Sequence, residues 1–167
     1  HDPSRPWKGM KADIWEGGHR VPFIASWPDK ISANSISGQV ICLTDVISSV
    51  ATILGISNEA GTMEDSFDIS PIFFGKNEPV RESIVHHSID GTFAIRKGDW
   101  KLIQGKNAGG FSKGLKIEGI PVETDGQLYN LTKDPSESIN LYADNPKKVN
   151  ELTELLNQYK IRGMSKL

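Results

Sequence analysis

The stretch Lys8-Gly9-Met10-Lys11-Ala12-Asp13-Ile14-Trp15-Glu16-Gly17-Gly18-His19-Arg20-Val21-Pro22 holds the densest group of functional residue types in the chain. It leads into an apolar run over residues 21–27, which Pro28 ends and which we expect to be a buried strand. In open α/β folds, ligands bind in loops at the ends of strands. A loop here would present Lys11 to an anion, while Gly17-Gly18 would let the backbone turn sharply. The stretch is therefore a candidate anion-binding loop, although from the residues alone an ordinary solvated lysine is the expectation we favour for Lys11.

Composition excludes several classes of protein. The 167 residues carry 19 Lys and Arg against 21 Asp and Glu, a net charge of −2, which gives no electrostatic reason to expect a nucleic-acid partner. The single cysteine, Cys42, rules out an internal disulfide and a multi-cysteine zinc site. The longest apolar stretch, residues 40–56, is broken by polar residues, so we expect no membrane span. No signal-peptide pattern opens the chain at His1, and we expect a processed protein or a fragment.

The first part of the chain contains one clear helix. Apolar residues recur at helical spacing over residues 45–54, with Thr44 as the expected N-cap and Gly55 as the expected C-cap. A shorter helical turn is expected over residues 68–74, stopped by Gly75.

The second part favours short strands closed by a terminal helix. Strands are predicted over residues 83–88, 92–96, 100–103 and 127–131, with a hairpin at Lys97-Gly98-Asp99. Asn145-Pro146 opens the last helix, which carries an apolar stripe at helical spacing and ends at Gly163.

Several motifs together carry a family resemblance. The residues Gly9-Met10-Lys11 and Glu16 to Pro22 fit the pattern G-x-K-x-x-x-x-E-G-G-x-R-V-P without a gap, and Trp27-Pro28 follows. Residues 90–103 and 127–131 and Asp134-Pro135-Ser136-Glu137 then come in the expected order. Over nearly its whole length the chain resembles the C-terminal portion of the sulfatase family.

The resemblance implies an α/β, alkaline-phosphatase-like fold. Residues 1–78 would form the C-terminal end of the large α/β domain. Residues 79–167 would form a small C-terminal subdomain, an antiparallel sheet with a terminal helix. The missing N-terminal part of the sulfatase is then the expected protein partner, and a periplasmic or secreted location is implied.

The same resemblance implies hydrolysis of sulfate esters, including those of sulfated carbohydrates. Family members use a formylglycine nucleophile and calcium, and Lys11 matches the lysine that contacts a sulfate oxygen. An ammonium there would stabilise negative charge that grows on the leaving oxygen. His1 stands where a C/S-x-P/A-x-R motif would need its nucleophile, and Cys42 lacks the residues that should follow it. No Asp-Asp pair and no Asp-Asn-Gly of the family's metal site stands before Lys11, so we also expect no metal ligand in this chain. Without an activated nucleophile we expect no turnover by the chain alone.

Other candidate residues surround the lysine. We expect His87 and His1 to contact substrate along with Lys11. His86 and His87 are neighbours on a predicted strand and point to opposite faces, so only one of them can face the substrate, and we expect it to be His87. Loop-bracing roles are expected for Glu16, Gly17, Gly18 and Arg20, and His19 is expected to be structural.

Two alternatives remain at this point. One is a phosphate or phosphonate ester hydrolase of the same superfold. The other is a non-catalytic module that binds sulfated glycans through a basic hairpin. That hairpin would comprise Arg96, Lys97, Lys101, Lys106, Lys113 and Lys116, although solvated cationic side chains are the expectation we favour. Asn130-Leu131-Thr132 matches a glycosylation sequon, a weak signal at this length.

Overall fold

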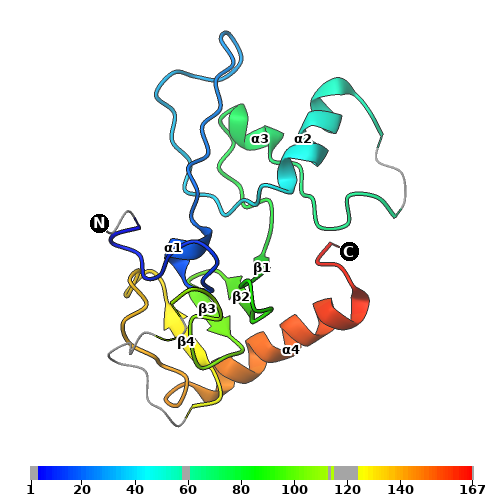
Figure 1. Ribbon diagram of the computed structural model, residues 1–167. Helices are drawn as coiled ribbons and strands as arrows, with labels where there is room; N and C mark the ends of the chain where they lie inside the picture. The colour runs from blue at the N-terminus through cyan, green and yellow to red at the C-terminus, as the bar shows by residue number, and fades with distance from the viewer. Residues whose placement is uncertain (1–3, 58–60, 113, 115–123, 167) are drawn as a thin grey trace. The chain divides into compact units, whose positions relative to one another are not determined.

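The structure is a computed structural model that describes residues 4–57, 61–112, 114 and 124–166. Its helices are α1 (Glu16–His19), α2 (Asp45–Leu54), α3 (Ser70–Phe73) and α4 (Pro146–Arg162), and its strands are β1 (Ser83–His87), β2 (Phe93–Lys97), β3 (Trp100–Ile103) and β4 (Gln127–Asn130) (Figure 1). All four predicted strands and the helices over residues 45–54 and 146–162 are confirmed, with shifts of one residue at some strand ends. The short helix α1 was not predicted.

The described residues form two compact units. The sheet unit contains residues 4–21 and 85–158, and the α2 unit contains residues 22–84 and 159–166. The loop that precedes the apolar run thus belongs with the strands of the second part of the chain. The division at residue 78 concerns the domains of a whole sulfatase and stays a prediction.

The sheet is antiparallel with strand order β1-β2-β3-β4, as the sequence predicts for a small subdomain. Its register aligns Arg96 with Lys101 and Lys101 with Tyr129, so these three side chains lie in one row on one face. The neighbouring row of Ile95, Leu102 and Leu128 points to the opposite face.

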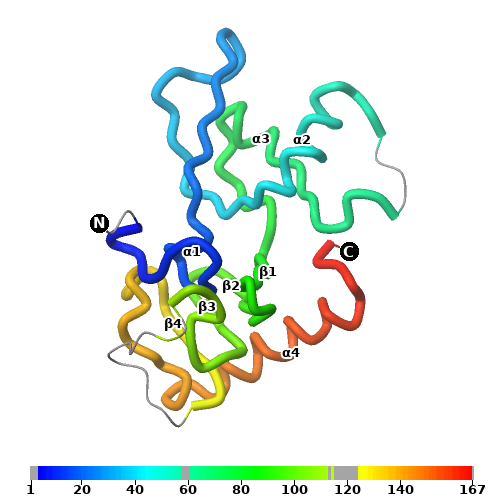
Figure 2. Tube along the Cα trace, viewed as in Figure 1, coloured from blue at the N-terminus to red at the C-terminus, as the bar shows by residue number. Residues whose placement is uncertain are grey.

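Both faces of the sheet are covered. On the face of Lys101, the segment before α1 inserts Ile14 and Trp15, which are fully buried and form one core cluster with Ala94, Ile103, Ala108, Tyr129 and Leu131. The trace in Figure 2 shows this N-terminal segment running close to the strands. The motif-rich stretch is therefore also a structural element that closes the core of the sheet unit.

The opposite face belongs to α4. Its residues Val149, Leu152 and Leu156 are buried, as the predicted stripe requires, and Thr153 shares a shallow hollow with Leu102 of β3. Gly163 ends the helix at φ +77°, a conformation that glycine adopts without the steric cost of a side chain.

The ends of α2 agree with the sequence only in part. Gly55 is the C-cap at φ +69°, as predicted. Thr44 is the N-cap residue, as predicted, but its side chain makes no capping hydrogen bond. The Asp45 carboxylate instead accepts a hydrogen bond of 2.7 Å from the backbone N–H of Cys42. This bond orders the turn before the helix.

The predicted buried strand over residues 21–27 is wrong for this chain. The segment is neither helix nor strand, and it is exposed, with Ile24 at 91%. A strand requires a neighbour for its hydrogen bonds, and within the described ranges no strand pairs with this segment. Its aromatic side chains contact the region of α3, where Phe23 stacks on Phe73 with ring centroids 6.1 Å apart.

Candidate active site

The turn that carries Lys11 is built around Asp13, whose side chain is fully buried. Asp13 Oδ2 accepts a hydrogen bond of 2.9 Å from the Met10 N–H and one of 2.6 Å from the Ser112 hydroxyl. Asp13 Oδ1 accepts one of 3.0 Å from the Ser112 N–H. Gly9 enters the turn at φ +82°. Sequence analysis did not identify Asp13, because its partner Ser112 lies far along the chain.

Backbone bonds fix the same turn on its other side. The Ala12 carbonyl accepts a hydrogen bond of 3.1 Å from the N–H of Ile89, and the Ile14 N–H donates one of 2.8 Å to Ala108. Lys11 itself is exposed, and among the described residues its side chain makes no hydrogen bond or ion pair. The result is a free ammonium group on a tightly held backbone, joined through Ala12 to the loop that follows His87.

Two glycines after the turn are required by close packing. A Cβ on Gly17 would lie 2.4 Å from the carbonyl oxygen of Gly9, and a Cβ on Gly18 would lie 2.1 Å from that of Asp13. Side chains essentially never approach backbone this closely, so this packing depends on the glycines. The Gly17 N–H also donates a hydrogen bond of 2.8 Å to Lys8. The glycine pair therefore lets α1 dock on the lysine turn.

Glu16 lies at the centre of a charged cluster at the start of α1. Its Oε2 accepts a hydrogen bond of 2.8 Å from Arg20 Nε, and its Oε1 lies 3.1 Å from Lys101 Nζ. The Arg20 guanidinium also lies over the Trp7 ring, 4.7 Å from its centroid. Burial raises the pKa of Glu16, but the charges and hydrogen bonds of Lys101 and Arg20 outweigh this and lower the pKa to about 2. Glu16 is thus a permanent anion that links α1 to β3.

Lys101 and Glu137 complete this cluster, and both are fully buried. Lys101 Nζ lies 2.8 Å from Glu137 Oε1, an ion-pair contact outside hydrogen-bond geometry, and Glu137 Oε2 accepts a bond of 2.6 Å from the Glu16 N–H. Burial raises the pKa of Glu137 in spite of Lys101. The sequence analysis did not identify the ion pairs of Lys101 with Glu16 and Glu137. The signal was the alternation in β3, which places Lys101 on the same inward face as Ile103.

A second polar contact joins the loop to β4. Trp15 Nε1 and the Tyr129 hydroxyl donate hydrogen bonds of 2.9 Å and 2.7 Å to Gln127 Oε1. Lys8 lies with its Nζ 4.5 Å from the centroid of the Trp15 ring and donates a bond of 2.9 Å to the Glu137 carbonyl. Burial lowers the pKa of Lys8, against the attraction of Glu137.

Histidines His19 and His86 form a half-buried pair. Their ring centroids are 4.1 Å apart, and the Nε2 atom of each is buried without a hydrogen-bond partner among the described residues. Burial, assisted by the charge of Lys101, lowers the pKa of His19 to about 4 and that of His86 well below its usual range. Both rings are therefore neutral at pH 7, the form that a buried imidazole without a counter-ion favours.

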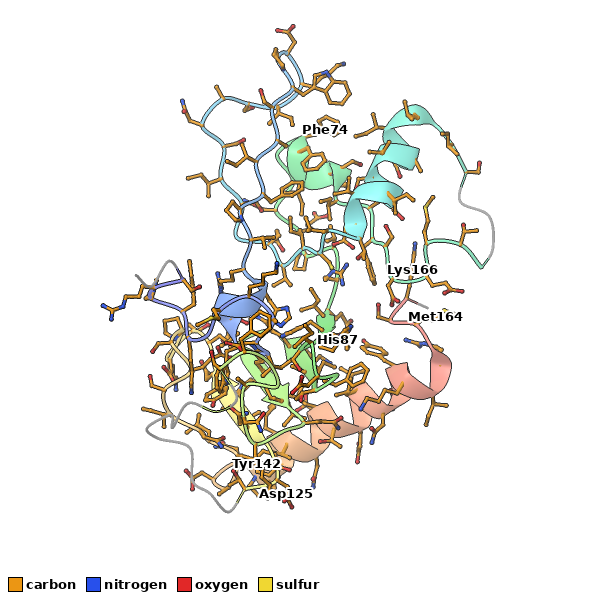
Figure 3. All side chains as sticks on the ribbon, in the orientation of Figure 1. Phe74, His87, Asp125, Tyr142, Met164 and Lys166 are labelled. Atoms are coloured by element: carbon orange, nitrogen blue, oxygen red, sulfur yellow. The ribbon has the colours of Figure 1, made fainter. Side chains whose placement is uncertain are left out.

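His87 takes the other side of β1. It is exposed at the end of the strand, where its ring lies 6.0 Å from that of Phe93 and its Nδ1 lies 2.8 Å from the Ser88 carbonyl oxygen (Figure 3). His87 is thus accessible to a ligand, and its substrate contact stays a prediction. His1 lies outside the described residues, so its predicted contact also stays a prediction.

The basic hairpin is not uniformly solvated. Lys101 is buried in the ion cluster, so the prediction of a solvated side chain is wrong for this residue. The exposed Lys106 pairs with Asp125 at 3.1 Å. Lys113 and Lys116 lie outside the described residues. The shallow hollow near this region is bordered by Asp125 and Tyr142, both labelled in Figure 3, and its lining does not include Lys11.

Three other sequence features have structural outcomes. Asn130 of the sequon is only 8% exposed, which leaves its amide poorly placed for a glycan. In the part of the chain that the structure describes, no helix combines the length and apolar character needed to cross a membrane. Calcium, implied by the resemblance, has no fitting site here, because nowhere in the described ranges do three His, Cys, Asp or Glu side chains gather as ligands.

The known proteins that resemble this chain, in sequence and in structure, are sulfatases. An N-acetylgalactosamine-6-O-sulfatase of Bacteroides thetaiotaomicron is 34% identical over 97% of this chain, and arylsulfatase G of Rattus norvegicus is 28% identical over 87% of it. The chain is similar to sulfatases over nearly its whole length. A solved structure from work on glycosaminoglycan metabolism by Bacteroides thetaiotaomicron superposes with a TM-score of 0.76 at 30% identity over 93% of the chain. No family model matches the sequence.

The match to sulfatase structures also confirms the predicted α/β, alkaline-phosphatase-like fold class. The described antiparallel sheet and α4 are consistent with the C-terminal portion of that fold. The chain spans about a third of its relatives, 31% of the curated Bacteroides sulfatase and 32% of the solved one. Its motifs therefore represent one section of a sulfatase, and the activity of a whole sulfatase belongs to the proposal that follows.

Proposed function

We propose that this chain supplies the sulfate-binding lysine, Lys11, of a sulfatase that hydrolyses sulfate esters of amino sugars. The observation that carries the proposal is the rigid turn around Asp13, which holds the Lys11 backbone while the ammonium stays unpaired among the described residues. The substrate class is suggested by the N-acetylgalactosamine-6-O-sulfatase, the relative with 34% identity. A secreted or periplasmic setting belongs to the same proposal.

The chemistry explains why an unpaired lysine is useful. Cleavage of a sulfate ester moves negative charge onto the leaving oxygen, and an ammonium fixed beside that oxygen stabilises the transition state more than the intact ester, whose negative charge lies on the other sulfate oxygens. An ion pair with a carboxylate in the same chain would weaken this effect, because it would neutralise the ammonium. Proton donation by Lys11 to the leaving oxygen is a second use of the same group.

The ion cluster beneath the turn has a supporting role in this proposal. Gly17 and Gly18 dock α1 against the lysine turn, and Glu16 anchors α1 to β3 through Lys101. The turn therefore rests on a buried scaffold. Such support limits the loss of conformational entropy when a sulfate is bound, which favours binding. The nucleophile and the calcium ligands would come from the part of a sulfatase outside this chain.

The test is a full-length hybrid enzyme. In the Bacteroides N-acetylgalactosamine-6-O-sulfatase, the segment that matches this chain over 162 residues is replaced by this chain. Lys11→Ala in the hybrid should lower kcat by about 100- to 1,000-fold, the usual effect of losing one donor to a developing oxyanion. Lys147→Ala, at another exposed lysine in α4, is the matched control and should leave kcat unchanged.

The outcome that contradicts the proposal is equally clear. If the Lys11→Ala hybrid keeps kcat within about threefold of the parent, far below the effect of a lost oxyanion donor, Lys11 does not contact the reacting group. The isolated chain should show no hydrolysis of a chromogenic aryl sulfate. Turnover by the isolated chain would show that it carries a nucleophile of its own.

A further inference from the structure

Helix α2 is inverted relative to an ordinary surface helix. Its buried residues are Asp45, Ser48, Ser49 and Ala51, whereas its large apolar side chains other than the half-buried Ile53 are exposed. Leu43, just before the helix, and Val46, Ile47, Val50 and Leu54 are between 37% and 65% exposed. Their spacing of three and four residues places them in one continuous stripe along the helix. We call these five residues the α2 stripe.

The buried polar face is fully built, so the orientation of α2 is specified. Asp45 Oδ1 accepts a hydrogen bond of 3.0 Å from the Phe67 N–H and forms a buried ion pair with Arg81. The Ser48 N–H donates a bond of 3.1 Å to Ser66 Oγ, and Ser49 Oγ accepts one of 2.9 Å from the Ile69 N–H. Rotating the helix to bury its stripe would break all of these bonds and strand a buried carboxylate.

We propose that the α2 stripe is an interface with the part of the sulfatase fold that this chain does not span. An amphipathic helix that faces water with its apolar side marks an interaction surface. The occupant must be apolar, because the one charged residue of α2, Asp45, is buried on the other face. This inference rests on the likeness to sulfatases and does not depend on the role of Lys11.

The length of the relatives identifies this occupant. The chain covers 32% of a solved sulfatase chain on which it superposes with a TM-score of 0.76, so about two thirds of that fold has no counterpart here. In α/β folds, helices bury an apolar stripe against a sheet. The nearby segment over residues 22–27 is exposed and unpaired among the described strands, as expected beside the same missing partner.

The test compares one pair of substitutions in two settings. Ile47→Ser with Leu54→Ser is made in the isolated chain and in the full-length hybrid enzyme described above. Ile161→Ser is the matched control, an apolar residue of α4 that is 88% exposed and lies off the stripe. Thermal unfolding is the readout, so failure of the Lys11 proposal does not affect the result.

The proposal predicts opposite outcomes in the two settings. In the hybrid, the double variant should lower the Tm by at least about 4 °C, because buried apolar side chains are lost. In the isolated chain, it should change the Tm by less than about 2 °C, because surface substitutions have small effects. The control should be silent in both settings.

Three results would overturn the inference. The first is a hybrid whose Tm is unchanged by the stripe substitutions. The second is an isolated chain that forms a dimer by light scattering and becomes a monomer in the double variant, since the occupant would then be a second copy. The third is a hybrid that does not fold, since the stripe would then fail to fit the rest of a sulfatase.

Discussion

Replacing Lys101 with methionine would remove the cation that holds Glu16 and Glu137 together. Lys101 is fully buried, with its Nζ 3.1 Å from one carboxylate and 2.8 Å from the other. Removing one member of a buried ion cluster leaves uncompensated charge and costs about 3–5 kcal/mol of stability. For a chain of this size, that corresponds to a fall in Tm of about 6–20 °C.

The assay is urea unfolding at pH 7, followed by circular dichroism and tryptophan fluorescence. Lys147→Met, at an exposed lysine, is the control and should stay within about 0.5 kcal/mol of the parent. Adding Glu137→Gln to Lys101→Met should recover part of the loss, because one of the two stranded anions disappears. A loss below about 1 kcal/mol in Lys101→Met would refute the reasoning, since the cluster would then not behave as a buried one.

Two further predictions use matched controls. Gly17→Ala should destabilise the chain by more than about 2 kcal/mol, because an added Cβ would lie 2.4 Å from a carbonyl oxygen. Gly38→Ala should have little effect, because an added Cβ there meets no described atom within 4 Å. Equal urea midpoints for the two variants would contradict this packing. Acid should also destabilise the chain through His19. The pKa of His19 is lowered to about 4 in the fold from about 6.5 when the chain is unfolded. Its contribution to the free energy of unfolding, at most about 3 kcal/mol, is therefore present above pH 6.5 and is lost as the pH falls toward 4. His19→Gln should reduce this loss in urea titrations at pH 7 and 4.5 and leave the part that is due to His86, while His87→Gln, at the exposed neighbour of the pair, should retain it in full. A steep, unchanged pH dependence in His19→Gln would assign the effect to other groups.

Local patterns predicted the regular elements of this chain well. The bounds of α2, β3 and α4 match the sequence predictions because each combines a clear apolar period with a terminal Gly or Pro. The segment over residues 21–27 failed for the opposite reason. Its strand character depends on neighbouring strands, which are absent among the described residues.

The site was predictable only as far as motif residues go. Lys11, Glu16 and the glycine pair stand together in one short stretch, and a single pattern identifies them. The partners of Glu16 are Lys101 and Glu137, and the partner of Asp13 is Ser112. These partners lie about 85 to 121 residues further on, and only folding brings them together. Sequence spacing carries no information on such long-range pairs, so buried charge in β3 was interpreted as part of a solvated hairpin.

The most direct test of the account is a crystal structure of the hybrid enzyme with a sulfated amino sugar bound. The account predicts Lys11 Nζ about 2.7–2.9 Å from an oxygen of the sulfate group, the usual length of a charge-assisted hydrogen bond. A sulfate group bound without Lys11, with the ammonium facing solvent, would contradict the central claim.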